Sequence, residues 1–306
     1  MHKNPRILIL RGGAIGDFIV TLPALQALRR RWPEAFIELL GYPHVARLAL
    51  GGGLVNTVRS LDEAGMARFF APMASFDPEQ VNFVRSFDLI VSWLHDPDEV
   101  VRNNFLYAGA RQVISGTPLV QKFHACECML KPLEELAIYS EHEVPRLDVL
   151  RELKAAGCEW LRRHGLETAV TAIHPGSGSP RKNWAPGNFI QLARALRERG
   201  KDCFFILGEA DAECGEAVRR NAPDFPVLDG CGLEELAGTL AHAALYLGND
   251  SGITHLAAAL GMRVIALYGP TDPALWGARG REVVHIQAPG GSLNRLEVGE
   301  VLNFIE

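Results

Sequence analysis

The chain alternates between short apolar runs and longer segments with apolar residues at helical spacing. In the first half, apolar runs predict buried strands at residues 6–10, 36–40, 57–61, 89–93 and 112–115. The segments between them can form helices, the first from Phe18 to about Trp32, with Pro23 in its early turns, where a missing N–H is tolerated. Strands that alternate with helices in this way are typical of a parallel, doubly wound sheet.

The same alternation begins again after a predicted connecting helix at residues 150–164, which ends at Gly165. A further helical segment, interrupted by Pro132, is predicted at residues 121–139. The second-half strands are predicted at residues 169–173, 203–207, 227–228, 243–247, 263–268 and 283–286, and its helices at 188–199, 211–220, 233–241, 256–260 and 296–305.

We therefore expect an α/β protein with two Rossmann-like doubly wound domains that face each other across a cleft. The predicted boundaries are residues 1–150 for the first domain and 151–294 for the second. The C-terminal helix, residues 295–306, lies outside both ranges because it could pack back on the first domain.

Composition narrows the class of protein. The 306 residues are 48% hydrophobic and 22% charged, which is typical of a soluble globular protein, and the net charge of -5 argues against general nucleic-acid binding. Three arginine clusters, at residues 29–31, 162–163 and 219–220, lie near predicted helix ends, where cations complement the helix dipole.

The first apolar run is too short for a signal-peptide core, and no later run reaches the length of a membrane span. We therefore expect a cytoplasmic protein whose six cysteines are reduced.

Two stretches suggest a metal but favour other interpretations. His124, Cys126 and Cys128 offer three ligands at a spacing unlike that of zinc sites, with no evident fourth ligand. Asp96 and Asp98 form a D-x-D pattern, but the pattern opens a predicted helix, which favours capping. We predict no metal site.

The stretch at residues 247–255, LGNDSGITH, combines the end of a strand, a polar turn and a helix start. Gly248 and Asn249 allow a sharp turn, and Asp250 or Ser251 can cap the helix. The free N–H groups of such a helix start favour a phosphate, although an ordinary capped helix would have the same sequence.

Loops after three other predicted strands could join this turn at the same sheet edge. Residues 174–184, HPGSGSPRKNW, combine small residues with two cations, which suits a pyrophosphate, although a flexible surface loop is equally consistent. Residues 268–273 carry two prolines and would form a pocket wall. Glu209 and Asp211 could accept hydrogen bonds from ribose hydroxyls or form the acidic first turn of a helix.

The first-half loop at residues 11–17 departs from a dinucleotide-binding fingerprint. Arg11 stands where the first glycine belongs, and Asp17 would repel a pyrophosphate. Asp17 is better suited to the cleft, where a carboxylate can act as a general base, with a capping role as the alternative.

Four motifs together resemble the heptosyltransferase family of bacterial lipopolysaccharide synthesis, glycosyltransferase family 9, which has the two-domain GT-B fold. They are GAIGD at residues 13–17 followed by TLPAL at 21–25, HPGS at 174–177 with KNW at 182–184, NDSGITHLAAA at 249–259, and YGPTDP at 268–273. The resemblance implies inverting transfer from a nucleotide-diphosphate sugar, typically ADP-heptose, to a lipid-linked core sugar, with no obligatory cofactor or metal.

The resemblance also assigns roles to individual residues. Asp17 falls on the catalytic base of the family. The donor contacts that it implies are Ser177, Gly178 and Lys182 near the phosphates, Glu209 or Asp211 at the ribose, Cys231 at the adenine, Asp250 at the sugar, and Ser251, Gly252 and Thr254 at the phosphate-binding helix start.

The acceptor would bind the first domain, and its lipid anchor would bring the protein to the inner face of the cytoplasmic membrane. The basic residues that could contact an anionic core sugar are Arg11, Arg102, Arg111 and Lys122. Two alternatives stay open at this point, an NAD(P)-dependent oxidoreductase and a catalytically inactive nucleotide-sugar binding protein.

Overall fold

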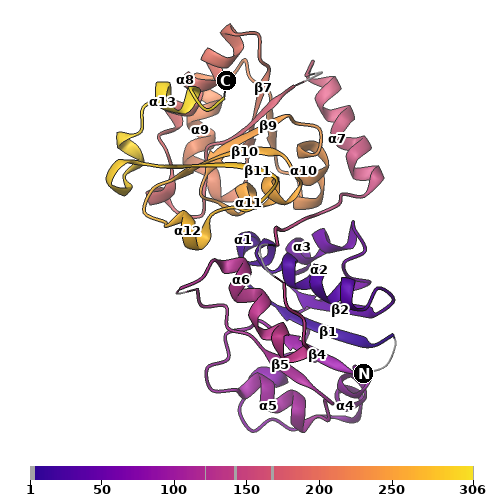
Figure 1. Cartoon of the computed structure of the whole chain (residues 1–306). Helices are drawn as coiled ribbons and strands as arrows, with labels where there is room; N and C mark the ends of the chain where they lie inside the picture. Colours follow the sequence, from indigo (N-terminus) through magenta and orange to yellow (C-terminus); the bar gives the residue numbers. More distant parts are fainter. Residues whose placement is uncertain (1–3, 121, 141–142, 167–168, 306) are drawn as a thin grey trace. The chain divides into compact units, whose positions relative to one another are not determined.

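The chain folds as two compact units, residues 1–145 and 146–306, each built on a parallel sheet (Figure 1). The computed structural model describes residues 4–120, 122–140, 143–166 and 169–305. Within this part of the chain, no helix is both long and apolar enough to cross a membrane.

The sheet of the first unit has the strand order β3-β2-β1-β4-β5. All its strands are parallel, with Ile7 of β1 paired to Ile37 of β2 on one side and to Leu89 of β4 on the other. The strands are β1 (Arg6–Arg11), β2 (Phe36–Gly41), β3 (Thr57–Ser60), β4 (Leu89–Ser92) and β5 (Val113–Ser115).

Helices and short 3₁₀ segments connect these strands. The α-helices are α1 (Ile15–Ile19), α2 (Leu22–Arg31), α3 (Pro43–Ala46), α4 (Pro78–Arg85), α5 (Val100–Tyr107) and α6 (Ala125–Leu130), and the 3₁₀ segments are η1 (Arg47–Leu50), η2 (Ala67–Phe70) and η3 (Lys131–Leu136).

The second unit contains a six-stranded parallel sheet with the order β11-β10-β9-β6-β7-β8. Its strands are β6 (Thr171–His174), β7 (Cys203–Leu207), β8 (Val227–Asp229), β9 (Leu245–Asn249), β10 (Arg263–Tyr268) and β11 (Glu282–Gln287). Its helices are α7 (Arg151–Arg163), α8 (Pro186–Glu198), α9 (Ala212–Asn221), α10 (Leu233–Leu240), α11 (Gly252–Ala259), α12 (Pro273–Trp276) and α13 (Val298–Leu302), with 3₁₀ segments η4 (Pro180–Lys182), η5 (Glu209–Asp211), η6 (Pro289–Gly291) and η7 (Leu293–Arg295).

The predicted fold class, two doubly wound α/β domains, is confirmed. The central strands read as continuous apolar runs because helices bury both of their faces: the four residues from Ile7 to Leu10 are all fully buried. The arginine clusters at residues 29–31, 162–163 and 219–220 occupy the last turns of α2, α7 and α9, as predicted.

Three predicted helices are shorter than expected. The helix expected at residues 18–32 is two helices, α1 and α2, and Thr21 between them donates its hydroxyl proton to the Asp17 carbonyl, 2.9 Å away. The segment expected at 121–139 is α6 followed by η3, which contains Pro132, and Gln121 lies outside the described residues. The terminal helix expected at 296–305 spans only Val298–Leu302.

The C-terminal residues belong to the core of the second unit. Val298, Val301 and Ile305 join the apolar cluster formed around β7, β9 and β10, and α13 packs on α8. The indole N–H of Trp184, a fully buried residue, donates to the Leu296 carbonyl at 2.9 Å. This hydrogen bond attaches the C-terminal segment to the loop that follows β6.

Helices α7 and α10 cross in direct backbone contact. A Cβ on Gly157 of α7 would overlap the carbonyl of Gly238 in α10, and a Cβ on Gly238 would overlap the carbonyl of Leu153. The two glycines therefore allow an approach that any side chain would prevent.

We expect Gly157→Ala to destabilise the protein by about 1–3 kcal/mol, because the added methyl group must push the two helices apart. Gly187→Ala is the matched control, since Gly187 also lies in a helix but a Cβ there would meet no atom within 4 Å. Thermal melting of both variants checks this expectation, and equal melting temperatures would contradict it.

Candidate functional site

The central strands of the second sheet define the place where a ligand would bind. The chain runs outward from β6 through β7 to β8 on one side and from β9 through β10 to β11 on the other. The order therefore reverses between β6 and β9, and in open parallel sheets ligands bind at the carboxyl ends of the strands at such a point. The loops after these two strands contain residues 175–185 and 250–251.

The side chain of Asn249 fastens these two loops together. Asn249 is the last residue of β9 and is fully buried. Its amide nitrogen donates to the Pro175 carbonyl at 2.8 Å, and its amide oxygen accepts the Trp184 N–H at 3.0 Å. Gly248 and Asn249 were expected to form a turn, but both belong to β9, and the turn begins at Asp250.

Ser251 caps helix α11, as expected. Its hydroxyl oxygen accepts the N–H of Thr254 at 3.3 Å. The N–H groups of Gly252 and Ile253 lie in the first turn and have no intrahelical acceptor, because α11 starts at Gly252. The helix start therefore offers N–H donors to an anion.

Lys182 and Asp250 form an ion pair between the two loops. The Lys182 ammonium lies 2.7 Å from Asp250 Oδ2, and the lysine side chain is 36% exposed whereas the aspartate side chain is 6% exposed. The aspartate holds the cation at the helix start and leaves part of it accessible to a ligand.

The rest of the β6–α8 loop is a compact turn rather than a flexible segment. The Ser177 hydroxyl lies 2.6 Å from the Asn183 amide oxygen and accepts the Ser179 N–H at 3.2 Å. Gly178, by contrast, is exposed, and a Cβ there would meet no atom within 4 Å. Its backbone is therefore open to close approach by a ligand.

The structure separates the two acidic candidates that follow β7. Glu209 is exposed, whereas Asp211 is buried and its Oδ2 accepts the Gly208 N–H at 2.7 Å and lies 3.0 Å from Nε2 of His174. Burial raises the pKa of Asp211, but the hydrogen bonds from His174 and Gly208 outweigh it and hold that pKa below its ordinary value. Of the two, only Glu209 is available to a ribose.

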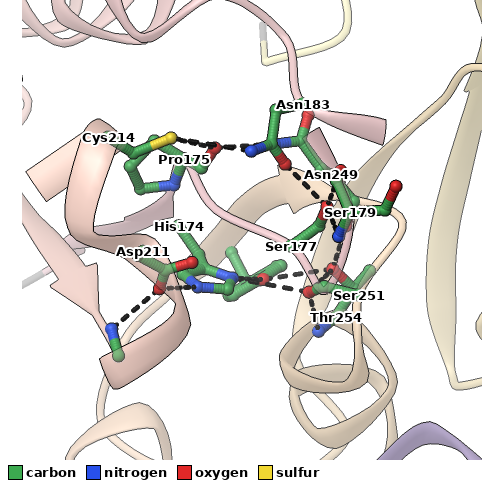
Figure 2. Close-up of polar contacts among 12 residues, drawn as sticks. His174, Pro175, Ser177, Ser179, Asn183, Asp211, Cys214, Asn249, Ser251 and Thr254 are labelled. Atoms are coloured by element: carbon green, nitrogen blue, oxygen red, sulfur yellow. Dashed lines mark hydrogen bonds and ion pairs between the residues drawn. The ribbon is translucent and has the colours of Figure 1, made fainter. Parts of the chain in front are cut away.

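His174, the last residue of β6, connects Asp211 to the helix start (Figure 2). Its ring lies between the Asp211 carboxylate and the Ser251 and Thr254 side chains. Nδ1 of His174 is 3.3 Å from the Tyr246 hydroxyl and 3.4 Å from that of Ser251. Close packing at this point requires Gly176, since a Cβ there would overlap the Asp211 carboxylate.

Cys231 lies just before α10, in the loop that follows β8. The side chain is partly buried, and burial raises the pKa of its thiol. Backbone groups at this position belong to the same carboxyl edge of the sheet as the loops after β6, β7 and β9.

In the first unit, Asp17 lies after β1, beside the corresponding reversal of strand order between β1 and β4. One carboxylate oxygen accepts the Ala14 N–H at 3.0 Å, so Asp17 caps α1 from its third position, and the other lies 3.7 Å from the Arg11 guanidinium. The Asp17 side chain is 35% exposed. It therefore stabilises the helix start and remains partly accessible to solvent.

Gly13 has a φ of +98°, and a Cβ there would come within 2.9 Å of Asp17 Oδ2. The glycine is thus needed both for the backbone conformation and for the space that the carboxylate occupies.

Arg11 was expected to face an anionic acceptor, but its side chain is buried. Its guanidinium donates to the Asp17 carbonyl, to the Thr21 hydroxyl at 2.9 Å and to the Trp93 carbonyl at 3.2 Å. Arg111 pairs with Asp88, whereas Arg102 is partly exposed and Lys122 is exposed.

In both stretches that suggested a metal, a candidate ligand accepts hydrogen bonds from backbone N–H groups at a helix start. The Asp96 carboxylate accepts the N–H groups of Val101 and Arg102 at the start of α5, which is the predicted capping role. Nδ1 of His124 accepts the Cys126 N–H at 3.1 Å at the start of α6. Among the residues that the structure describes, no three acidic, histidine or cysteine side chains gather as metal ligands would.

His174, Tyr246 and Asn249 contribute hydrogen bonds to the site but were not predicted to do so from the sequence. A signal was available, because each is a hydrogen-bonding residue within or at the end of an apolar strand. Such residues must find polar partners inside the protein.

Comparison with known proteins points to one family. The family model of glycosyltransferase family 9 (heptosyltransferase) matches residues 115–302. The chain is 33% identical to lipopolysaccharide heptosyltransferase 1 of Salmonella typhimurium, with 98% of this chain and 99% of that protein covered.

Solved structures show the same fold. The family 9 glycosyl transferase of Veillonella parvula superposes with a TM-score of 0.82 at 19% identity, covering 99% of this chain and 97% of that one. The E. coli heptosyltransferase WaaC with ADP superposes with a TM-score of 0.72 at 21% identity, covering 98% of both chains.

The two parallel sheets, with polar loops at the carboxyl ends of their central strands, define a glycosyltransferase of the GT-B fold. More particularly, the chain belongs to glycosyltransferase family 9, the heptosyltransferases of lipopolysaccharide core biosynthesis.

We expect Asp211→Asn to lower the free energy of unfolding at pH 7 by about 1–3 kcal/mol, because a buried charged hydrogen-bond acceptor is lost. The folded-state pKa of Asp211 lies below its ordinary value of 3.8, so the carboxylate contributes stability above about pH 4 and loses it as the pH falls through the folded-state pKa. Urea unfolding between pH 3 and pH 7 should show the variant and the wild type converging at the acid end.

The exposed carboxylate of Asp224 provides the control for this measurement, because Asp224→Asn removes an acid that pairs with Arg197 at the surface. A difference between wild type and Asp211→Asn that stays constant down to pH 3 would contradict the expectation.

Proposed function

We propose that the protein transfers heptose from ADP-heptose to a lipopolysaccharide core sugar, with inversion at the anomeric carbon. The observation that carries this proposal is the Lys182–Asp250 pair beside the free N–H groups of α11, at the reversal point of the second sheet. The fold that the chain shares with the E. coli heptosyltransferase WaaC, solved with ADP, supports ADP as the nucleotide.

In the proposed donor complex, the diphosphate contacts Lys182, the N–H groups at Gly252 and Ile253, and the turn at Ser177 and Gly178. The remaining contacts are assigned to Asp250 at the heptose, Glu209 at the ribose and the backbone around Cys231 at the adenine, with Ser251 and Thr254 holding the helix start. Asp211, the other acidic candidate, is assigned a structural role because its carboxylate is already bound by His174 and Gly208.

Lys182 and the helix start would stabilise the leaving group. Negative charge builds on the diphosphate as its bond to the anomeric carbon breaks, and fixed positive groups lower the energy of that state. A cation held by Asp250 is already oriented before the donor binds, so no obligatory metal is needed in this proposal.

Asp17 would act as the general base. Its carboxylate takes the proton of the acceptor hydroxyl while the hydroxyl oxygen attacks the anomeric carbon, and the electrons of the broken carbon–oxygen bond leave with the diphosphate. The Asp17 side chain is 35% exposed, and the Arg11 guanidinium lies 3.7 Å from its Oδ1. Burial lowers the pKa of Arg11, and Asp17 opposes that shift.

The acceptor partner in this proposal is a lipid-linked core oligosaccharide, with Arg102 and Lys122 as the remaining basic candidates. An enzyme with such an acceptor would work in the cytoplasm at the inner face of the membrane. We propose no nucleic-acid partner, in keeping with the net charge of -5.

The two alternatives are less well supported. A dinucleotide would need the first N–H groups after β1 for its pyrophosphate, but the Asp17 carboxylate already accepts the Ala14 N–H there. A catalytically inactive binding protein would keep the Lys182–Asp250 pair, and its Asp17 would serve only to cap α1.

We expect calorimetric titration to detect binding of ADP, and weaker or no binding of UDP, GDP and NAD. Lys182→Ala should weaken ADP binding by about 10- to 100-fold, because the diphosphate loses a cation and meets an unpaired Asp250 carboxylate. Arg181→Ala is the matched control, since Arg181 is an exposed cation in the same 3₁₀ turn. Tight NAD binding without ADP binding would overturn the proposed donor site.

We expect Asp17→Asn to reduce the transfer rate by about 10²- to 10⁴-fold while the ADP affinity stays near that of the wild type. The asparagine oxygen can still accept the Ala14 N–H, so the fold of the loop should be retained. Steady-state transfer assays with ADP-heptose and a core acceptor, run with and without EDTA, measure both the role of Asp17 and the metal requirement. Near-normal turnover of Asp17→Asn would exclude Asp17 as the base.

A further inference from the structure

A continuous set of mostly buried polar groups lies behind the proposed diphosphate site, and two of its members, His174 and Tyr246, have no part in the reaction described above. It runs from Asp211 through His174 to the hydroxyls of Tyr246, Ser251 and Thr254 (Figure 2). His174, Tyr246 and Thr254 are 4%, 0% and 0% exposed, so their hydrogen bonds must be made inside the protein.

Asp211 determines which nitrogen of the His174 ring carries the proton. Its Oδ2 accepts the Gly208 N–H at 2.7 Å and lies 3.0 Å from His174 Nε2. An ionised carboxylate can only accept hydrogen bonds, so Nε2 must be the donor. In the neutral ring Nδ1 is then an acceptor, and it faces the two hydroxyls of Tyr246 and Ser251.

The directions of the hydroxyl protons follow from the same count of donors and acceptors. Thr254 donates its hydroxyl proton to the Asn249 carbonyl, so Thr254 Oγ1 can only accept from Tyr246 and Ser251, each 3.1 Å away. The Ser251 proton has two acceptors within the protein, Thr254 Oγ1 and His174 Nδ1. A lone pair of the Ser251 oxygen is thereby directed at the Thr254 N–H that it caps.

The opposite tautomer would disturb this arrangement. An unprotonated Nε2 would face Asp211 Oδ2 at 3.0 Å, with lone pairs on both atoms and no proton between them. A proton on Nδ1 would be donated to the Ser251 or Tyr246 oxygen, and the Ser251 hydroxyl would lose Nδ1 as an internal acceptor for its own proton.

We propose that His174, oriented by Asp211, is a positioning residue for donor binding: its unprotonated Nδ1 keeps the Ser251 hydroxyl turned inward and so fixes the helix start that receives the diphosphate. The inference rests on the proposed donor site at Ser251, Gly252 and Thr254. It assigns to His174 no contact with the donor and no proton transfer to substrate.

Two substitutions at His174 test the roles of its two ring nitrogens separately. His174→Asn places an amide oxygen near the position of Nδ1 and keeps an acceptor for the hydroxyls, but it loses the donor to Asp211. His174→Gln keeps an amide donor near the position of Nε2 but removes the acceptor. His242→Gln is the control, because His242 is exposed and its ring contacts only the Lys154 carbonyl, at 2.8 Å, among the hydrogen bonds described.

We expect the ADP dissociation constant to rise at least tenfold in His174→Gln and to stay within about threefold of the wild type in His174→Asn and His242→Gln. The KM for the donor should rise in the glutamine variant while kcat at saturating donor changes much less. Thermal melting of the three variants identifies any general loss of stability. If ADP binding falls equally in both His174 variants and follows their melting temperatures, the positioning role is overturned.

Nitrogen-15 NMR of the histidine rings tests the proton assignment directly, without a ligand. The signals that disappear in His174→Gln should belong, in the wild type, to a protonated Nε2 and an unprotonated Nδ1. A protonated Nδ1 would overturn the inference. Absence of ADP binding by the wild type would instead refute the proposed donor site, so the two failures can be distinguished.

Discussion

The second unit depends on the side-chain amide of Asn249 to hold together the two loops of the proposed donor site. It lies at the reversal point of the sheet, where the loops after β6 and β9 would otherwise be free to move apart. By accepting the Trp184 N–H and donating to the Pro175 carbonyl, it holds both ends of the loop that carries Lys182. An apolar residue of the same size would leave the buried Trp184 N–H without its acceptor and the Pro175 carbonyl with only the Cys214 thiol at 3.6 Å, which is why an asparagine ends an otherwise apolar strand.

Arg11 has the corresponding role in the first unit. It ends β1, and its guanidinium connects the β1 loop to the Trp93 carbonyl after β4, across the reversal point of that sheet. The same side chain donates to the Asp17 carbonyl and to the Thr21 hydroxyl, at the point where α1 ends and α2 begins. Both units thus use one buried polar side chain at the end of a central strand to fix the loops of the reversal point, although an amide does this in one unit and a cation in the other.

Much of the fold could be predicted from the sequence because the parallel strands are buried on both faces and read as apolar runs between turn residues. The predictions failed where a tertiary contact decides the local structure. Gly248 and Asn249 look like a turn in isolation, but Gly248 pairs with both β10 and β6, and Asn249 pairs with β10, so both belong to β9. Glu209 and Asp211 cannot be distinguished by residue type, because only the packing of His174 and Gly176 shows that Asp211 is enclosed. Lys182, Asp250 and Ser251 could be proposed from the sequence because their motifs match a family, whereas the contacts of His174 with Asp211 and Ser251 become visible only in the structure.

The open surroundings of Gly178 make this residue a practical attachment point. It lies in a turn that is otherwise held by Ser177 and Asn183, its backbone does not require glycine, and a Cβ there would meet no atom within 4 Å. A single cysteine introduced here could therefore carry a small environment-sensitive fluorophore beside the loop of Lys182 without displacing any neighbour. A change in fluorescence would then report that a ligand occupies this edge of the sheet. Of the six natural cysteines, the exposed Cys158 would be replaced first, whereas Cys126, Cys203 and Cys214 are buried.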